Sequence, residues 1–198
     1  FGLKKAKGEW VLFVDADERV TPALRAEIFN FQFSIFNGAY LKRKDFFLGR
    51  WLKFGETDNV KLLRLAKKKA GKWQRRVHEF WETKGKVKKL KNPLLHYSHK
   101  NLTNFLKSIN WFSSINAEVF CHQERGLTLF EWGKPLAKFI QNYFFRLGFL
   151  DGFPGLVMAS MMSLHSLITR VKVWEVLFPA KSSASTKTSF SSSASIKE

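Results

Sequence analysis

The fold is decided by the stretch WVLFV at residues 10–14, which is followed at once by DADE at residues 15–18. Five apolar residues with an abrupt acidic stop have the length of a β-strand, and the unbroken apolar run predicts burial on both faces. Thr21 and Pro22 then supply an N-cap and a first helical residue, which predicts a helix over residues 22–31. A strand, a turn and a helix in this order indicate an α/β fold.

Further strands and helices are expected along the chain. Hydrophobic patterning predicts strands over residues 38–43 and 60–65. Residues at i, i+3, i+4 and i+7 predict a long amphipathic helix over residues 102–125, with a second helix over 131–147. The predicted face of the first helix is Leu102, Phe105, Leu106, Ile109, Phe112, Asn116, Val119 and Phe120. The expected organisation is an α/β domain over residues 1–100, a helical extension over 101–178 and a disordered Ser-rich tail over 179–198.

Composition limits the possible partners. The chain has 198 residues, with 34 Lys and Arg against 16 Asp and Glu, so its formal net charge of +18 favours an anionic partner. Its single cysteine excludes an internal disulfide framework and a Cys-rich zinc site. Residues 152–169 carry no Asp, Glu, Lys or Arg but include glycine, proline and serine, which favours a membrane-interfacial or re-entrant segment over a full span.

The acidic turn after the first strand is the main candidate for chemistry. Asp15 and Asp17 lie two residues apart and leave an apolar strand together. Hard carboxylate oxygens in such a turn suit Mg²⁺ or Mn²⁺, and the cation would in turn hold a diphosphate. The alternative is an acidic turn that only caps the following helix, because carboxylates are also favoured at a helix N-terminus.

Several motifs follow one another in a recognisable order: GEWVLFVDADERV, YLKRKDFFLGRWLKFG, KLLRL, RRVHEFWE and LLHYSHKNLTNFLKSIN. In their order and spacing the sequence resembles the family 2 glycosyltransferases of the GT-A fold, and in particular the bacterial group that builds lipopolysaccharide core and related surface glycans. The resemblance covers residues 1–178. It implies the C-terminal part of a GT-A domain, truncated at its N-terminus, because the units that bind the nucleotide base and ribose would precede the strand at residue 10.

The resemblance implies a role for each matched residue. Asp15 and Asp17 match the pair that binds the divalent metal and the diphosphate of a nucleotide-sugar, and His96 matches the histidine that completes this site. Glu79 matches the general base that deprotonates the acceptor hydroxyl. The implied reaction is metal-dependent transfer of a sugar from a nucleotide-sugar to a glycolipid or cell-surface glycan, with inversion. The stretch from residue 47 to residue 55 matches the acceptor-side loop.

The residues themselves leave alternatives open at these positions. Glu79 can instead form an ion pair with a neighbouring arginine, Arg75 or Arg76. His96 follows two leucines, which is also typical of a core histidine. Sugar stacking and a place in the core are both open for three tryptophans: Trp51, Trp73 and Trp81.

The basic stretch over residues 67–91 completes the prediction. Near an anionic leaflet each such residue contributes about 1 kcal/mol, so we expect a membrane-associated enzyme on the cytoplasmic face of the inner membrane. A solvated hairpin surface explains the same charges. Two other functions are weighed: a basic nucleic-acid-binding module and an inactive membrane-bound transferase remnant. No helix-turn-helix, zinc-finger, RRM or KH signature is recognisable, so nucleic acid is not the expected partner.

Overall fold

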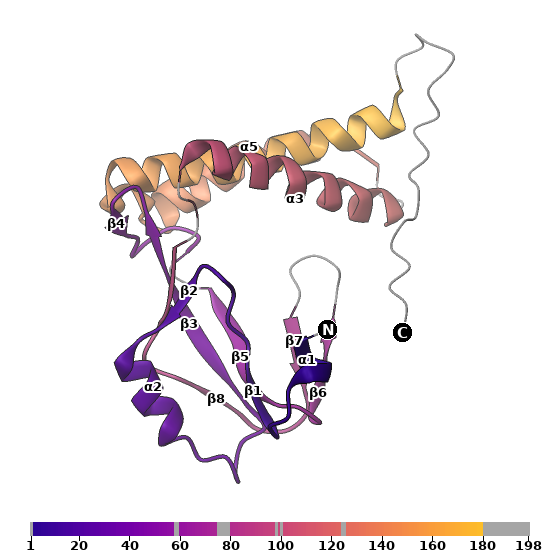
Figure 1. Cartoon of the computed structure of the whole chain (residues 1–198). Coiled ribbons are helices and arrows are strands. Elements are labelled where there is room, and N and C mark those ends of the chain that lie inside the picture. Colours follow the sequence, from indigo (N-terminus) through magenta and orange to yellow (C-terminus); the bar gives the residue numbers. More distant parts are fainter. Residues whose placement is uncertain are drawn as a thin grey trace.

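The computed structural model describes residues 2–57, 60–74, 80–97, 99, 101–123 and 126–179. These residues form a mixed α/β structure in which a curled sheet lies below a layer of long helices (Figure 1). The expected α/β class is therefore confirmed. The Ser-rich tail lies outside the described residues, apart from its first position, residue 179.

The sheet is built around one long central strand, β3 (Gly38–Phe47). Within the described part of the chain its main order is β1-β5-β3-β9-β2, with β4 and β8 also paired to β3. Strands β8 and β9 run parallel to β3, whereas β4 and β5 run antiparallel to it. The other bounds are β1 (Trp10–Leu12), β2 (Glu18–Val20), β4 (Arg50–Trp51), β5 (Lys61–Lys67), β8 (Val87–Lys89) and β9 (Leu94–His96), with a separate hairpin of β6 (Gly71–Gln74) and β7 (Phe80–Thr83).

The first strand differs from its prediction. β1 ends at Leu12 and pairs antiparallel with β5 alone, at the edge of the described sheet. Its three residues are half-buried, and Val14 beyond it is exposed. The prediction of a strand buried on both faces was therefore wrong. The apolar run is still accounted for, because Trp10 and Leu12 pack on one core cluster while Phe13, just beyond β1, packs against Trp81 from the neighbouring hairpin.

The first long helix follows its sequence signals closely. α2 (Pro22–Phe29) begins where Thr21 Oγ1 accepts a hydrogen bond from the Leu24 backbone N–H at 3.0 Å, as expected of an N-cap. It ends two residues earlier than predicted. Leu24 is fully buried and joins a hydrophobic core between α2 and the main sheet: Leu24, Phe31, Ala39, Leu41, Leu65, Leu90 and Leu94.

Three helices form the upper layer: α3 (Leu102–His122), α4 (Leu129–Ile140) and α5 (Phe153–Leu177). A π-helical turn, η1 (Gln141–Phe145), and a 3₁₀ turn, η2 (Gly148–Asp151), link the last two. A further four-residue helix, α1 (Gly2–Lys5), precedes the sheet. α3 and α4 each pack against α5, so α5 is the central helix of the layer.

The buried faces of these helices also required correction. Along α3 the core face is Phe105, Ile109, Ser113 and Ala117, whereas Leu102, Leu106 and Phe112 of the predicted face are exposed. The uncharged segment 152–169 buries five residues inside the structure: Pro154, Gly155, Met158, Ala159 and Met161. It is thus a packed helix in the centre of the layer. Among the described residues, no helix has the length and apolar character needed to cross a membrane.

Candidate functional site

The acidic turn is closed by its own glutamate. The backbone N–H of Glu18 donates to the carbonyl of Asp15 at 3.0 Å, and the backbone N–H of Asp15 donates to Glu18 Oε2 at 2.8 Å. Glu18 is buried, so this reciprocal pair fixes the backbone between β1 and β2. The two aspartates therefore stand on a rigid turn rather than on a loose loop.

An arginine from the adjacent strand binds this turn. Arg64 Nη2 on β5 lies 2.5 Å from Asp15 Oδ2 and 3.3 Å from Glu18 Oε1. Asp15 keeps 57% of its side chain exposed. The sequence left open whether these carboxylates cap the next helix, but the helix is capped by Thr21 and Asp15 is paired with Arg64 instead. The acidic turn is thus paired with the positively charged guanidinium of Arg64 on β5.

The second aspartate meets the predicted histidine. His96 Nε2, at the end of β9, lies 3.3 Å from Asp17 Oδ2, and the backbone N–H of Tyr97 donates to the Asp17 carbonyl at 2.9 Å. This happens because β9 pairs antiparallel with β2, with Glu18 opposite His96. The structure therefore brings together Asp17 and His96, which the sequence placed in one site.

A third residue, missed from the sequence, holds the other side of the histidine. Asp45 on β3 is almost fully buried, and its Oδ1 makes a close contact with His96 Nδ1. Arg43 Nε lies 3.0 Å from the same carboxylate oxygen. His96 is thus held between Asp17 and Asp45, and a simple apolar core environment does not describe it.

A metal would find two donors side by side in this arrangement. Asp17 and His96 present Oδ2 and Nε2 to the same space, and Asp17 keeps 47% of its side chain exposed. A carboxylate on the far nitrogen of a ligating histidine is the usual way in which proteins orient such a ligand, and Asp45 occupies that position. Asp15 points to Arg64 instead, and within the described residues no group of three or more His, Cys, Asp and Glu is arranged as a metal site. The Asp17 carboxylate suits a cation that keeps most of its ligands from substrate and water, as Mg²⁺ commonly does, whereas the His96 imidazole is a nitrogen ligand that Mg²⁺ rarely takes.

The predicted base and the predicted stacking residues have different outcomes. Glu79 lies outside the described residues, together with its neighbours from residue 75 onward, and so does the side chain of Trp73. Trp81 is only 2% exposed, within a core cluster that includes Leu63 and Ala66. It is therefore a core residue and presents no free face to a sugar.

An aromatic cluster lies next to His96 instead. Trp51 and Tyr97 have ring centroids 5.3 Å apart, and Phe46 lies 5.0 Å from Trp51 and 5.6 Å from Tyr97. Tyr97 is exposed, and Lys44 Nζ lies 5.6 Å from the centre of the Trp51 ring. Trp51 thus lies beside Tyr97, the residue that follows His96 in the chain.

A neighbouring histidine is part of the packing behind the site. His99 stacks on Phe105 of α3 with ring centroids 3.8 Å apart. Burial lowers the pKa of His99, and the nearby His96 lowers it further. His99 thus fills the space between the end of β9 and the helical layer.

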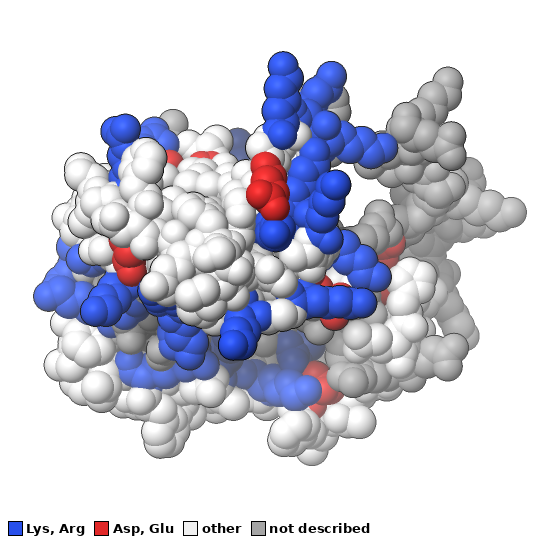
Figure 2. All heavy atoms as spheres, turned by 90° about the horizontal axis from the view of Figure 1, so that it is seen from below, with Lys and Arg blue, Asp and Glu red and all other residues white. Residues whose placement is uncertain are grey.

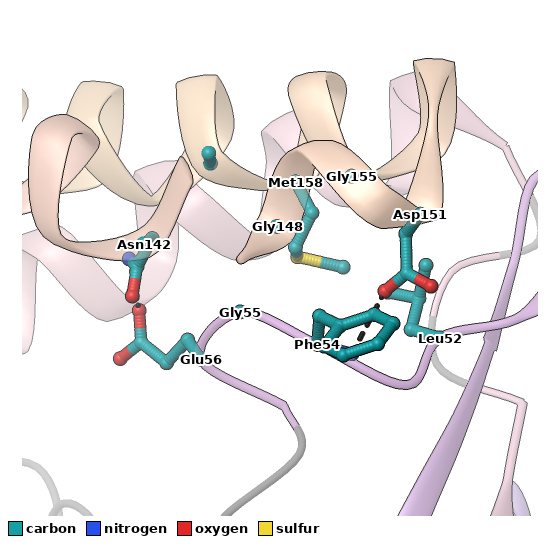
Figure 3. A pocket seen from close by; sticks show the side chains of 10 residues that line it. Leu52, Phe54, Gly55, Glu56, Asn142, Gly148, Asp151, Gly155 and Met158 are labelled. Carbon is teal, nitrogen blue, oxygen red and sulfur yellow. Dashed lines mark hydrogen bonds between the residues drawn. The ribbon is translucent and has the colours of Figure 1, made fainter. Parts of the chain in front are cut away.

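The junction between sheet and helices forms a second polar cluster, which is structural. Asp151 in η2 is buried, and its carboxylate accepts hydrogen bonds from the backbone N–H groups of Phe54 at 2.9 Å (Figure 3) and Lys53 at 3.0 Å. Glu56 likewise accepts from Asn142 Nδ2 at 3.0 Å. The cavity between them measures about 10 Å³, the space of one water molecule, so it cannot receive a nucleotide or a sugar.

Comparison with known proteins adds no assignment. No protein-family model matches the sequence. No solved structure matches the chain with significance.

Proposed function

We propose that this chain is part of a GT-A-type glycosyltransferase that moves a sugar from a nucleotide-sugar to a glycolipid or cell-surface glycan. The observation that carries the proposal is the contact of His96 with both Asp17 and buried Asp45. Asp17 comes from the turn before β2, His96 from the end of β9 and Asp45 from β3. The resemblance to family 2 glycosyltransferases, with its motifs in order over residues 1–178, supports the same assignment.

The residues of the site divide the chemistry among them. Asp17 and His96 would hold a divalent cation, Mg²⁺ or Mn²⁺, and Asp45 would keep the histidine Nε2 directed at it. When bound, the cation supplies the positive charge that neutralises the departing diphosphate. Arg64 fixes Asp15 and adds positive charge at the same turn. Glu79 is expected to take the proton of the acceptor hydroxyl, as one base must in an inverting transfer.

The acceptor side is supported by the aromatic cluster. The stretch from residue 47 to residue 55 corresponds by resemblance to the acceptor-side loop, and it begins where β3 and β4 bring Trp51 beside Tyr97. Tyr97 is exposed and Trp51 is half-buried, and aromatic rings at a surface are suited to stack on the apolar face of a sugar. The expected setting is the cytoplasmic face of an anionic inner membrane, where a glycolipid acceptor would be reached.

The test is release of nucleoside diphosphate from a panel of nucleotide-sugars in the presence of Mn²⁺ and an extract of membrane glycolipids. We expect His96→Ala and Asp17→Ala to abolish release. His122→Ala is the matched control, because His122 is an exposed histidine on α3. We expect Glu79→Gln to bind donor but not to transfer the sugar.

Two results would count against the proposal. Full activity of His96→Ala would remove the histidine from the site. Absence of release by the unmodified chain with every donor would favour the inactive-remnant interpretation.

A further inference from the structure

Helix α4 and the turn after it place polar residues inward and apolar residues outward, the reverse of a surface helix in a water-soluble protein. The side that faces inward is polar: Glu131 and Asn142 are buried, and Lys138 Nζ lies 2.8 Å from Glu56 Oε1. The side that faces outward is apolar, with Leu129 90% exposed, Phe130 76% and Phe145 80%. An amphipathic helix in water places these two faces the other way round.

Polar contacts fix this orientation. Arg170 Nη2 on α5 lies 2.9 Å from Glu131 Oε2, and Arg170 Nη1 also donates to Ser166 Oγ at 2.7 Å. Ser163 Oγ donates to the carbonyl of Pro135 at 2.8 Å. A rotation of α4 that hid its phenylalanines would carry Glu131 away and leave the largely buried Arg170 guanidinium without its carboxylate, which is strongly destabilising. The outward apolar face is therefore imposed by the packing.

The exposed apolar surface continues past α4 through both turns. Its members are exposed phenylalanines, leucines and an isoleucine that follow one another along α4, η1, η2 and the start of α5: Leu129, Phe130, Leu136, Ile140, Phe144, Phe145, Leu147, Phe149, Leu150 and Phe153. We refer to this set as the α4 face. A monomeric soluble protein rarely exposes so many large apolar side chains in one run, so a partner is expected to cover it.

Charge decides whether a second copy of the chain or an anionic membrane covers the α4 face. From residue 126 to residue 179 the chain has five Lys and Arg and three acidic residues, and two of these acids, Glu131 and Asp151, are buried. A second copy would bring like charges together in a chain of net charge +18, whereas an anionic surface attracts them. Trp132 and Trp174, with ring centroids 6.1 Å apart, add the amphipathic rings that favour the headgroup level of a bilayer.

The basic stretch that the sequence analysis assigned to the membrane lies elsewhere. The described residues of this stretch, 67–74 and 80–91, run through β6, β7 and β8, in the lower part of the molecule and apart from the layer of α3 and α5 (Figure 1). Seen from that side, Lys and Arg side chains cover much of the surface and acidic ones are few (Figure 2). The basic stretch and the α4 face therefore belong to different parts of the molecule.

We propose that the α4 face lies flat in the boundary between headgroups and acyl chains of an anionic bilayer, with Phe130, Phe145 and Phe153 inserted. This inference rests on the proposed membrane location and specifies which surface makes the contact. Lys134 on the flank of α4, whose side chain is 41% exposed, would lie at headgroup level. The sheet and its acidic turn would then project from the membrane toward a soluble nucleotide-sugar.

The test is co-sedimentation of the full chain with vesicles of phosphatidylcholine alone and of equal parts phosphatidylcholine and phosphatidylglycerol. We expect binding to the anionic vesicles only, weakened by salt. Each inserted phenylalanine replaced by glutamine should lower the partition coefficient by about tenfold. The double variant Phe130→Gln/Phe145→Gln should therefore lose nearly all binding. Phe29→Gln is the matched control, because Phe29 is a 71% exposed phenylalanine on α2, among the sheet elements.

The contrary outcomes are separable. If the double variant binds like the unmodified chain while keeping its circular dichroism spectrum, another surface contacts the membrane and the inference is wrong. If the unmodified chain binds no vesicles, the proposed membrane location itself fails. If sedimentation velocity shows a dimer that the double variant lacks, the α4 face is an interface between copies.

Discussion

Removal of the Asp151 carboxylate is expected to loosen the helical layer from the sheet. This carboxylate accepts from the backbone N–H groups of Phe54 (Figure 3) and Lys53, and Arg50 Nη1 donates to the Asp151 carbonyl at 3.0 Å. These bonds join the loop after β4 to the turn before α5. Asp151→Ala deletes two of the three and leaves the bond to the carbonyl.

The size of the effect follows from the two hydrogen bonds that the substitution removes. A hydrogen bond to a charged acceptor contributes about 1.5–3 kcal/mol, and a donor left unsatisfied in a buried place costs a similar amount. Both N–H groups are partly buried, so the lower value applies and Asp151→Ala should reduce the free energy of unfolding by about 3 kcal/mol. Asp151→Asn can keep an oxygen at the Oδ2 position, which accepts from both donors, so it should cost only about 1 kcal/mol.

The assay is urea unfolding followed by far-ultraviolet circular dichroism, with thermal melting in parallel. A loss of about 3 kcal/mol corresponds to a fall in Tm of roughly 6–12 °C for a chain of this size. Glu175→Ala, an exposed carboxylate in the last turns of α5, is the control and should change stability by less than about 0.5 kcal/mol. Equal stability of Asp151→Ala and the unmodified chain would show that the carboxylate does not tie the two layers together.

Two further carboxylates give independent predictions. Burial raises the pKa of Glu27, but hydrogen bonds from Lys91 and Asn92 outweigh it and hold that pKa below its usual value of 4.5. The stabilisation by Glu27 should therefore be full above pH 4.5 and be lost as the pH falls through the lowered pKa, so acid titration of stability should bring the unmodified chain and Glu27→Gln together; a constant gap at all pH values would contradict this. Asp45→Asn should weaken Mn²⁺ affinity, measured by calorimetry, by about 10–100-fold through loss of the carboxylate that orients His96, and unchanged affinity would refute that positioning role.

Local signals predicted local structure well. Thr21 and Pro22 located the start of α2, because a cap and a fixed φ act within one turn of the chain. The predicted strands over 38–43 and 60–65 correspond to β3 and β5, although β3 runs four residues further. The edge position of β1 depends on which strand pairs with it, and that information is not in the stretch WVLFV.

Only part of the candidate site could be predicted from the sequence, because strand pairing brings its residues together. Asp17 and His96 were named from the sequence and are in contact, but Asp45 and its partner Arg43 were missed. A usable signal was present, since the alternation along β3 places Arg43 and Asp45 on the same buried face as Leu41. A charged pair on the buried face of a strand is unusual enough to mark a site.

The inverted orientation of α4 was beyond sequence reasoning. Its periodicity shows two faces but not which one turns inward, and the usual rule assigns the apolar face to the core. The inward position of Glu131 depends on Arg170, which comes from another helix. Within the uncharged segment 152–169, Met158 and Met161 pack in the core with Phe47 and Phe105, whereas Phe153 stays exposed as part of the α4 face.

The most direct test of the account is calorimetric titration of the chain with UDP, GDP and other nucleoside diphosphates, with and without Mn²⁺. We expect binding of one nucleotide class that requires the metal, is abolished by Asp17→Ala and is unaffected by His122→Ala. Binding that is indifferent to Mn²⁺ and to Asp17→Ala would contradict the metal and diphosphate roles assigned to Asp17 and His96.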